Sequence, residues 1–216
     1  MPRYLAEFIG TFFLVLTIGM TVIGAPSGVI PPLAIGAVLL VMVYAGGHIS
    51  GAHYNPAVTL AVWMRGKCPT TDVPGYMIAQ VAGAVTAAIL AIYLMGSPEV
   101  TVAAPDVFRW LVAEFVFTFA LAYVVLNVAT AKETDGNSYF GLAIGFTVMA
   151  GAFAMGAVAA AAFNPAVAIG LIAMGKLAAA DIWIFLIANF AGGALAAIVF
   201  RLLHPDTTRE RMTNDE

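Results

Sequence analysis

The tripeptide Asn-Pro-Ala occurs twice in this chain, and each copy begins an apolar stretch too short to cross a membrane. About ten residues give roughly 15 Å of helix, half the hydrocarbon thickness of a bilayer, so such a segment has to enter and return on the same side. Asn is favoured just before a helix, and Pro costs little in its first turn. Two short helices are therefore expected to begin at the motifs, whose residues are Asn55, Pro56, Ala57, Asn164, Pro165 and Ala166.

The composition indicates an integral membrane protein. The chain is 62% hydrophobic and 10% charged, with a mean hydropathy of +0.97, whereas about a quarter of a soluble domain is charged. Its 216 residues allow about six membrane spans of about 20 residues each. The net charge is −3 and the basic residues form no dense cluster, so nucleic-acid binding is not expected.

The second half of the chain repeats the first. At an offset of 109, residues 33–36 (Leu-Ala-Ile-Gly) match 142–145, and the two Asn-Pro-Ala motifs match each other. At an offset of 107, residues 6–8 (Ala-Glu-Phe) match 113–115. Matches that keep the same order indicate an internal repeat.

Each copy contains two apolar spans, a short apolar segment and a third span. The expected ranges are 4–24, 32–47, 56–64 and 75–96, then 107–130, 139–157, 165–174 and 181–203. Three full spans per copy is an odd number, so the second copy enters the membrane from the opposite face and the repeats are inverted. The sequence predicts an all-α membrane protein with six transmembrane helices and two re-entrant half-helices. One channel domain is expected over 1–203, with inverted repeats at about 4–96 and 107–203.

The basic residues predict the orientation. With the N-terminus inside, only Arg109 and Lys176 of the nine Lys and Arg residues fall on the outer side. Both termini are therefore expected in the cytoplasm, in a multi-pass protein of the cell (inner or plasma) membrane. Residues 204–216 are expected to form a polar cytoplasmic tail.

Inverted repeats would place the N-termini of the two short helices together near the middle of the membrane, with both positive dipole ends facing one lumen. Amide hydrogens of Asn55 and Asn164 would donate to the oxygen of a passing molecule, and backbone carbonyls around His53 and Ala162 would accept. The segment 46–52, which contains three glycines, and the segment 156–162, which begins with Gly156, are expected to let the chain descend to these helices. The arrangement favours a small neutral solute and disfavours cations, hydronium included.

Glu7 and Glu114 are ionisable groups at equivalent positions just inside two spans, where such groups usually face the bundle interior. We expect each to accept hydrogen bonds from the descending loop of its half; a proton relay or ion site is the alternative. His53 is expected to support the first loop, with a pH gate as the alternative. The sequence has no metal-ligand spacing, cofactor motif or nucleophile–base pair, so no metal, cofactor or enzymatic activity is expected.

These residues resemble the aquaporin, or major intrinsic protein, family. Residues 47–60, Gly-His-Ile-Ser-Gly-Ala-His-Tyr-Asn-Pro-Ala-Val-Thr-Leu, follow that family's first pore loop, and 6–11 resemble its first helix. The resemblance extends from about residue 5 to 203. It implies a six-helix bundle with two half-helices, one pore in each subunit, a homotetramer, and water or small neutral solutes as cargo.

One position departs from the family pattern. Members usually carry Arg directly after the second Asn-Pro-Ala, where it narrows the outer mouth, but this chain has Val167. By their spacing from the two motifs, the other filter positions of the family correspond to Ile35, Ala152 and Ala161 in this chain. Gly151 replaces Ala152 if the register slips by one. The implied filter is apolar and wide enough to admit glycerol, urea or neutral metalloid hydroxides, unless a neighbouring loop or side chain refills the gap.

Two other functions remain open from the sequence. A secondary transporter also uses inverted repeats and broken helices, but it normally has ion-coordinating or proton-coupling residues at the midplane, where this chain has amides. A junction or scaffold protein would have the same fold with a poorly conducting pore. The amides favour a passive channel.

Overall fold

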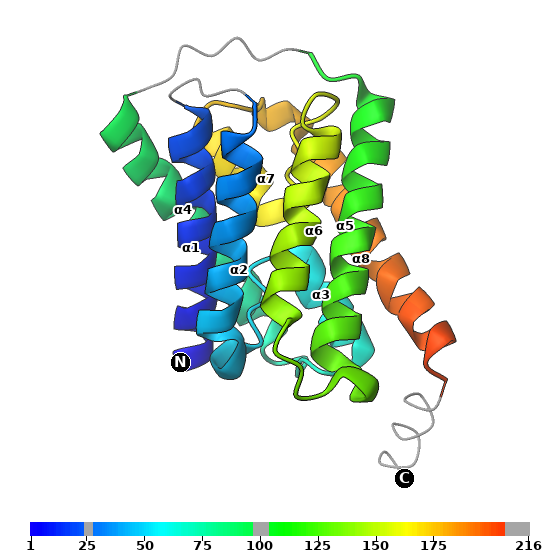
Figure 1. The fold of residues 1–216 in the computed structure, drawn as a ribbon. Coiled ribbons are helices and arrows are strands. Elements are labelled where there is room, and N and C mark those ends of the chain that lie inside the picture. The colour runs from blue at the N-terminus through cyan, green and yellow to red at the C-terminus, as the bar shows by residue number, and fades with distance from the viewer. Residues whose placement is uncertain (24–27, 97–103, 206–216) are drawn as a thin grey trace.

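The computed structural model describes residues 1–23, 28–96 and 104–205, which form a bundle of helices (Figure 1). The first half contains α1 (Pro2–Val22), α2 (Ile30–Ser50), the short α3 (Pro56–Arg65) and α4 (Val73–Met95). The second half contains α5 (Val107–Thr130), the 3-10 turn η1 (Lys132–Thr134), α6 (Phe140–Met155), the short α7 (Pro165–Ala173), the 3-10 turn η2 (Ala179–Asp181) and α8 (Ile182–Leu203). Every helix begins and ends within three residues of its expected range.

Five of the described helices are long and apolar enough to cross a membrane: α1, α2, α4, α5 and α8 taken together with η2. The sixth expected span, α6, has 16 residues and is about 24 Å long, less than a full crossing. It is short because the chain leaves the helix at Gly156 to begin its descent toward α7.

The two halves pack in the same way. α1 lies along α4 in the first half and α5 lies along α8 in the second, while α2 packs on α6 across the halves. Each short helix packs on a long helix of the other half, α3 on α8 and α7 on α4. α3 lies at one end of the bundle and α7 at the other, as inverted repeats require (Figure 1).

The paired helices approach most closely at equivalent glycines. A Cβ on Gly83 of α4 would lie 2.5 Å from the carbonyl oxygen of Phe8, and a Cβ on Gly192 of α8 would lie 2.7 Å from that of Phe115. Only glycine fits against a backbone atom at such distances. Small residues at helix contacts stabilise bundles in lipid, where the hydrophobic effect does not drive helices together.

The first descending segment begins later than the glycines suggested. Gly46 and Gly47 lie inside α2, and only Gly51, with a φ of +86°, provides the left-handed turn that ends it. Gly46 has a packing role instead, because a Cβ there would overlap the hydroxyl of Tyr54. The second segment begins at Gly156, as expected.

Residues 24–27, 97–103 and 206–216 lie outside the described part of the chain. The expected end of the first span at residue 24 therefore lies outside it. So do most of the connection before α5 and all but the first two residues of the expected 204–216 tail.

A candidate solute pore

The two Asn-Pro-Ala motifs cap the two short helices. Asn55 has an extended backbone before α3, and its Oδ1 accepts a hydrogen bond of 2.8 Å from the amide of Ala57. Asn164 caps α7 in the same way, accepting from the amide of Ala166 at 2.9 Å. Each side chain thereby satisfies a backbone N–H that has no partner within its own helix.

The same asparagines form hydrogen bonds between the two halves of the molecule. Nδ2 of Asn55 donates to the carbonyl oxygen of Phe163, and Nδ2 of Asn164 donates to that of Tyr54, both at 2.8 Å. A side-chain amide carries two donor hydrogens, so each asparagine retains one that this crossed pair of bonds does not use. The remaining hydrogens are the expected donors to a passing molecule.

Four residues next to the motifs have a left-handed backbone although none of them is glycine. They are Ala52, Tyr54, Ala161 and Phe163, with φ between 49° and 52°, and they form two pairs at the 109-residue offset. This conformation costs such residues on the order of 1 kcal/mol or more each. The sequence did not reveal them, because Ala, Tyr and Phe rarely adopt it.

Glu7 holds the first strained loop in place. Its Oε1 accepts hydrogen bonds from the hydroxyl of Ser50 at 2.6 Å and the amide of His53 at 2.9 Å. Its Oε2 accepts from the amide of Tyr54 and from Nε2 of Gln80, both at 2.7 Å. Four donors converge on one buried carboxylate, so these charge-assisted bonds offset the backbone strain.

Glu114 holds the second loop with three donors. Its Oε1 accepts from the amide of Ala162 at 2.9 Å, and its Oε2 accepts from the amide of Phe163 at 2.7 Å and from Nδ2 of Asn189 at 3.1 Å. Both glutamates thus accept hydrogen bonds from backbone amides of the descending loops. Neither contacts a second carboxylate or a histidine side chain of the described residues that would extend a proton relay.

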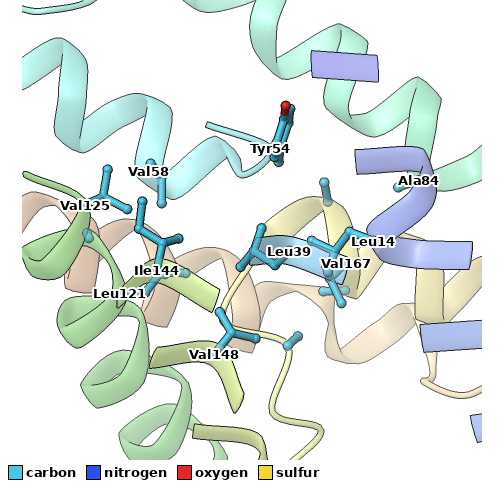
Figure 2. Packing of buried hydrophobic residues seen from close by; sticks show 14 of the residues in the cluster. Leu14, Leu39, Tyr54, Val58, Ala84, Leu121, Val125, Ile144, Val148 and Val167 are labelled. Atoms are coloured by element: carbon cyan, nitrogen blue, oxygen red, sulfur yellow. The ribbon is translucent and has the colours of Figure 1, made fainter. Parts of the chain in front are cut away.

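A cavity of about 500 Å³ runs along the bundle and includes both asparagines. Its lining includes Pro31 at the start of α2 and Ala157 just after the end of α6, and these helix ends lie at the end of the bundle opposite the chain termini (Figure 1). Its walls are mainly aliphatic side chains from α1, α2, α5 and α6; those labelled in Figure 2 are Leu14, Leu39, Leu121, Val125, Ile144 and Val148.

All four predicted filter residues line this one cavity. Ile35 comes from α2, Ala152 from α6, Ala161 from the second loop and Val167 from the first turn of α7. The four side chains are apolar, so they bring neither a charge nor a hydrogen-bond donor to the lumen. The structure therefore places together residues that the sequence separates by more than a hundred positions.

The alternative filter residue Gly151 lies elsewhere. A Cβ at this position would come within 2.6 Å of the rings of Phe117 and Phe163, so Gly151 faces the packing between α5 and the second loop. Its neighbour Ala152 lines the cavity. This placement supports the register that assigns Ala152 to the filter.

Some lining residues were not found by the sequence reasoning. Pro31 and Pro32 at the start of α2, and Phe153 in the last turn of α6, line the open end of the cavity. Phe153 is 48% exposed and is the largest side chain there. Its position depends on where α6 ends, and the apolar pattern around it gave no signal of that end.

Cys68 lies in the connection between α3 and α4. Burial raises the pKa of its thiol to about 11, with a further contribution from nearby Asp72, so the thiol is neutral at physiological pH and is a poor metal ligand. Among the residues that the structure describes, no group of three or more His, Cys, Asp or Glu side chains could hold a metal ion.

An inverted repeat of membrane helices, with two half-helices that meet tip to tip beside a central cavity, is an arrangement found in membrane channels and transporters. The family model described as Major intrinsic protein matches residues 1–200. The chain belongs to the major intrinsic protein family, whose members include the aquaporins. It is therefore a multi-pass membrane protein and a passive channel for water or small solutes, not an enzyme.

The similar proteins agree with this assignment. The chain is 37% identical over 208 residues to Aquaporin NIP1-4 of Oryza sativa subsp. japonica, which covers 92% of this chain and 76% of that protein. It is 33% identical over 220 residues to Aquaporin NIP1-2 of Arabidopsis thaliana, with 94% and 74% covered. The X-ray structure of the aquaglyceroporin from Plasmodium falciparum superposes with a TM-score of 0.80 over 96% of this chain and 98% of that one; at 19% identity this shows the fold.

Proposed function

We propose that this channel conducts water together with larger neutral solutes such as glycerol, urea and neutral metalloid hydroxides. The observation that carries the proposal is the apolar set Ile35, Ala152, Ala161 and Val167 on the wall of the cavity that also contains both asparagines. A filter of these side chains has no fixed cation to narrow the lumen. It presents methyl groups to the carbon atoms or apolar edges of a solute.

Ions would be excluded near the asparagine pair. The N-termini of α3 and α7 both point to this region, and each carries the partial positive charge of a helix dipole. An ion entering between apolar walls also loses hydration that four alkyl side chains cannot replace. Cations and protons would therefore meet an electrostatic barrier at Asn55 and Asn164, which supply the expected donors to neutral molecules.

The membrane context completes the proposal. We place both termini in the cytoplasm and the protein in the cell membrane as a homotetramer, with residues 1–203 forming one channel domain per subunit. The bundle end at which α1 begins and α8 ends carries most of the basic residues of the described chain, whereas Arg109 and Lys176 lie at the other end. This asymmetry supports the orientation through the positive-inside rule.

The test is stopped-flow light scattering of proteoliposomes containing the purified protein, with protein-free liposomes as the baseline. Water and glycerol, urea or arsenite are each expected to cross faster than the baseline. Passage of water alone would show that the filter is closed to larger solutes. An uptake that collapses with a protonophore would indicate a coupled transporter, and a conductance in planar bilayers would contradict the proposed ion barrier.

The filter itself is tested by Val167→Arg, with Val167→Leu as the control that changes the side chain without adding a charge. Val167 lines the cavity from the first turn of α7. A guanidinium at Val167 is expected to lower glycerol permeability at least about tenfold relative to water, because it fills the lumen with a large hydrated cation. An unchanged solute range in Val167→Arg, in protein that still conducts water, would place the constriction elsewhere.

A further inference from the structure

The carboxylate of Asp72 lies at the start of α4 but does not cap that helix. Asp is a favoured N-cap residue and Asp72 occupies the N-cap position, yet its side chain makes no capping hydrogen bond. It accepts instead from two residues of α1, the guanidinium of Arg3 and the hydroxyl of Tyr4, the latter at 2.8 Å. The carboxylate therefore joins the beginnings of two neighbouring helices.

The ring of Tyr4 has a fitted place on α4. A Cβ on Gly75 would lie 2.7 Å from Cε1 of Tyr4, so the missing side chain of Gly75 makes room for the ring. The Tyr4 ring also meets the ring of Tyr76 edge to face, with centroids 5.8 Å apart and an interplanar angle of 85°. Tyr4 is thus held at its hydroxyl by Asp72 and along its ring by residues of α4.

Tyr76 connects this cluster with the first descending loop. Its hydroxyl donates to the carbonyl oxygen of Ser50 at 2.8 Å, and Ser50 is the last residue of α2, directly before the left-handed turn at Gly51. The Tyr76 ring lies against the ring of His53, with centroids 5.0 Å apart. One buried side chain of α4 therefore contacts both the backbone at the start of the loop and a side chain further along it.

The second half folds without such a cluster. At the repeat offsets of 109 and 107, Phe185 stands in place of Tyr76 and Leu111 in place of Tyr4. Neither carries a hydroxyl, so neither can make the hydrogen bonds of its counterpart, and the ring of Phe185 packs on that of Trp110 instead, with centroids 5.8 Å apart. The cluster is therefore not needed to build a half of this fold, which indicates a role particular to the first loop.

We propose that Tyr76 is a positioning residue of the pore, which holds the first descending loop at the wall of the lumen, and that Tyr4 and Asp72 keep Tyr76 in place. This proposal deepens the proposed channel function and rests on it. Residues 52–55 of the loop line the cavity, and Tyr76 lies behind them, outside that lining. A loop released from Tyr76 moves toward the cavity, because helices pack behind it. Such a movement obstructs glycerol more than it obstructs water.

The cluster is expected to persist near neutral pH. The hydrogen bond from Tyr4, and after it the interaction with Arg3, hold the pKa of Asp72 below its ordinary value. A carboxylate of this kind stabilises the folded state above its pKa in the unfolded chain, and the contribution is lost as the pH falls through the lower, folded-state pKa. The hold on the loop is therefore lost only in acid and does not change over the physiological range.

The first experiment measures local opening of the loop by hydrogen exchange in the full-length protein, without any solute. The amides of residues 53–54 in the first loop and 162–163 in the second all donate to a glutamate, so both pairs are protected. Tyr76→Phe removes one hydroxyl and is expected to accelerate exchange at 53–54 about threefold to tenfold, the effect of one hydrogen bond, and to leave 162–163 unchanged. Tyr93→Phe, at an exposed tyrosine of the same helix, is the matched control and is expected to change neither pair.

The comparison of the two loops separates positioning from general stability. Unchanged exchange at 53–54 in Tyr76→Phe would overturn the proposal. Equal acceleration in both loops would also overturn it, because Tyr76 would then be a residue that stabilises the whole fold.

Two further variants test the cluster from its other side. Tyr4→Phe removes the hydrogen bond to Asp72 and keeps the ring, whereas Gly75→Ala displaces the ring and removes no polar atom. Alanine also favours a helix more than glycine does, so faster exchange in Gly75→Ala would not come from a weaker α4. Both variants are expected to accelerate exchange at 53–54, by less than Tyr76→Phe does. If neither has an effect, the part assigned to Tyr4 and Asp72 is wrong.

The last experiment measures the glycerol-to-water permeability ratio in proteoliposomes, which does not depend on the amount of folded channel. Tyr76→Phe is expected to lower the ratio about threefold, because the loop then occupies part of the lumen for part of the time. Tyr93→Phe is expected to leave it unchanged. An unchanged or higher ratio in Tyr76→Phe would overturn the inferred movement of the loop into the lumen.

The two proposals fail in different ways. If the wild-type protein conducts water and no glycerol, the wide filter is wrong, and hydrogen exchange still decides whether Tyr76 positions the loop. If glycerol permeates and neither the exchange at 53–54 nor the permeability ratio responds to Tyr76→Phe, the wide filter stands and the role of Tyr76 is wrong.

Discussion

The two halves of this channel have the same order of long and short α-helices but differ in polarity. The polar residues around the first descending loop are Ser50, His53, Thr59, Tyr76 and Gln80, and their equivalents 109 residues later are Ala159, Ala162, Ala168, Phe185 and Asn189. Both halves keep the glutamate, the asparagine and the two left-handed residues. Those groups satisfy backbone hydrogen bonds in both halves, whereas the surrounding polar side chains differ.

The exchange of Gln80 for Asn189 shows how hydrogen bonding differs in the second half, which has fewer polar side chains. In the first half Nε2 of Gln80 reaches Oγ1 of Thr59 on the short helix α3, at 3.0 Å. In the second half the shorter Asn189 donates to Oγ1 of Thr118 on α5, at 2.9 Å, and α7 carries no hydroxyl at the corresponding position. Thr11, the counterpart of Thr118, has a buried hydroxyl without a partner among the described residues.

This difference has a consequence for function. The second loop carries the predicted filter residue Ala161. Surrounding side chains make fewer hydrogen bonds to this second loop than to the first loop. The first loop carries His53 in a network that fixes the ring. The first loop is therefore held more firmly than the second loop, which carries the predicted filter residue.

The largest expected effect comes from removing the charge of either glutamate. In Glu7→Gln one oxygen becomes an N–H donor, and neither orientation of the amide avoids a backbone N–H, since His53 faces one position and Tyr54 the other. Glu114→Gln has the same conflict. We expect each to lose about 2 to 4 kcal/mol of unfolding free energy, with the greater loss at Glu7 because four donors converge there.

These losses are measured by thermal unfolding in detergent, followed by circular dichroism. Asp135→Asn, on an exposed carboxylate between α5 and α6, is the control for the change of charge and is expected to unfold like the wild-type protein. A greater loss of unfolding free energy for Glu114→Gln than for Glu7→Gln would contradict the inference that the first loop is held more firmly than the second.

Much of this comparison could be predicted from the sequence. The repeat, the half-helices, the equivalence of the two glutamates and the ranges of the spans follow from local patterns of apolar residues, Asn-Pro and spacing. The left-handed backbone at Tyr54 and Phe163 could not, because it is imposed by carboxylates more than forty residues away. The role of Gly46 was wrong for a related reason: its helix continues, and its missing side chain makes room for a distant ring.

The site was only partly predictable. The filter positions could be carried over by spacing, and the structure places all four on one cavity, but their function as a filter stays a prediction. The position of the His53 ring depends on Thr59 and Tyr76 together. No short sequence pattern encodes that combination, because Tyr76 lies more than twenty residues further along the chain.

A smaller effect is expected from filling the space at Gly46. In Gly46→Ala the new methyl group overlaps the hydroxyl of Tyr54, which has to move away from its bond to the carbonyl oxygen of Met42. We expect a loss of about 2 kcal/mol, the usual cost of overpacking. Gly47→Ala in the next position meets only the movable edge of the Phe140 ring at 3.3 Å, so it is the matched control and is expected to cost less than about 1 kcal/mol.

Adding Tyr54→Phe to Gly46→Ala relates this test to the difference between the two halves. Tyr54→Phe gives the first half the residue that Phe163 provides in the second, and it removes the atom that the new methyl group overlaps. Gly46→Ala with Tyr54→Phe is therefore expected to be more stable than Gly46→Ala alone. If the double variant is the less stable of the two, the Tyr54 hydroxyl is not what requires glycine at position 46.

The smallest effect tests the exchange of hydrogen bonds directly. Gln80→Asn shortens the side chain so that it no longer reaches Thr59, and we expect a loss of about 1 kcal/mol. Adding Thr59→Ala copies the second half, where an alanine occupies the short helix. Each single variant already removes the one Gln80–Thr59 hydrogen bond, so the double variant should lose less than the sum of the two single losses. Unfolding measurements on the two single variants and the double variant give this coupling. Additive losses would mean that the hydrogen bond between Gln80 and Thr59 does not stabilise the first half, and that the exchange of hydrogen bonds between the halves has no energetic consequence.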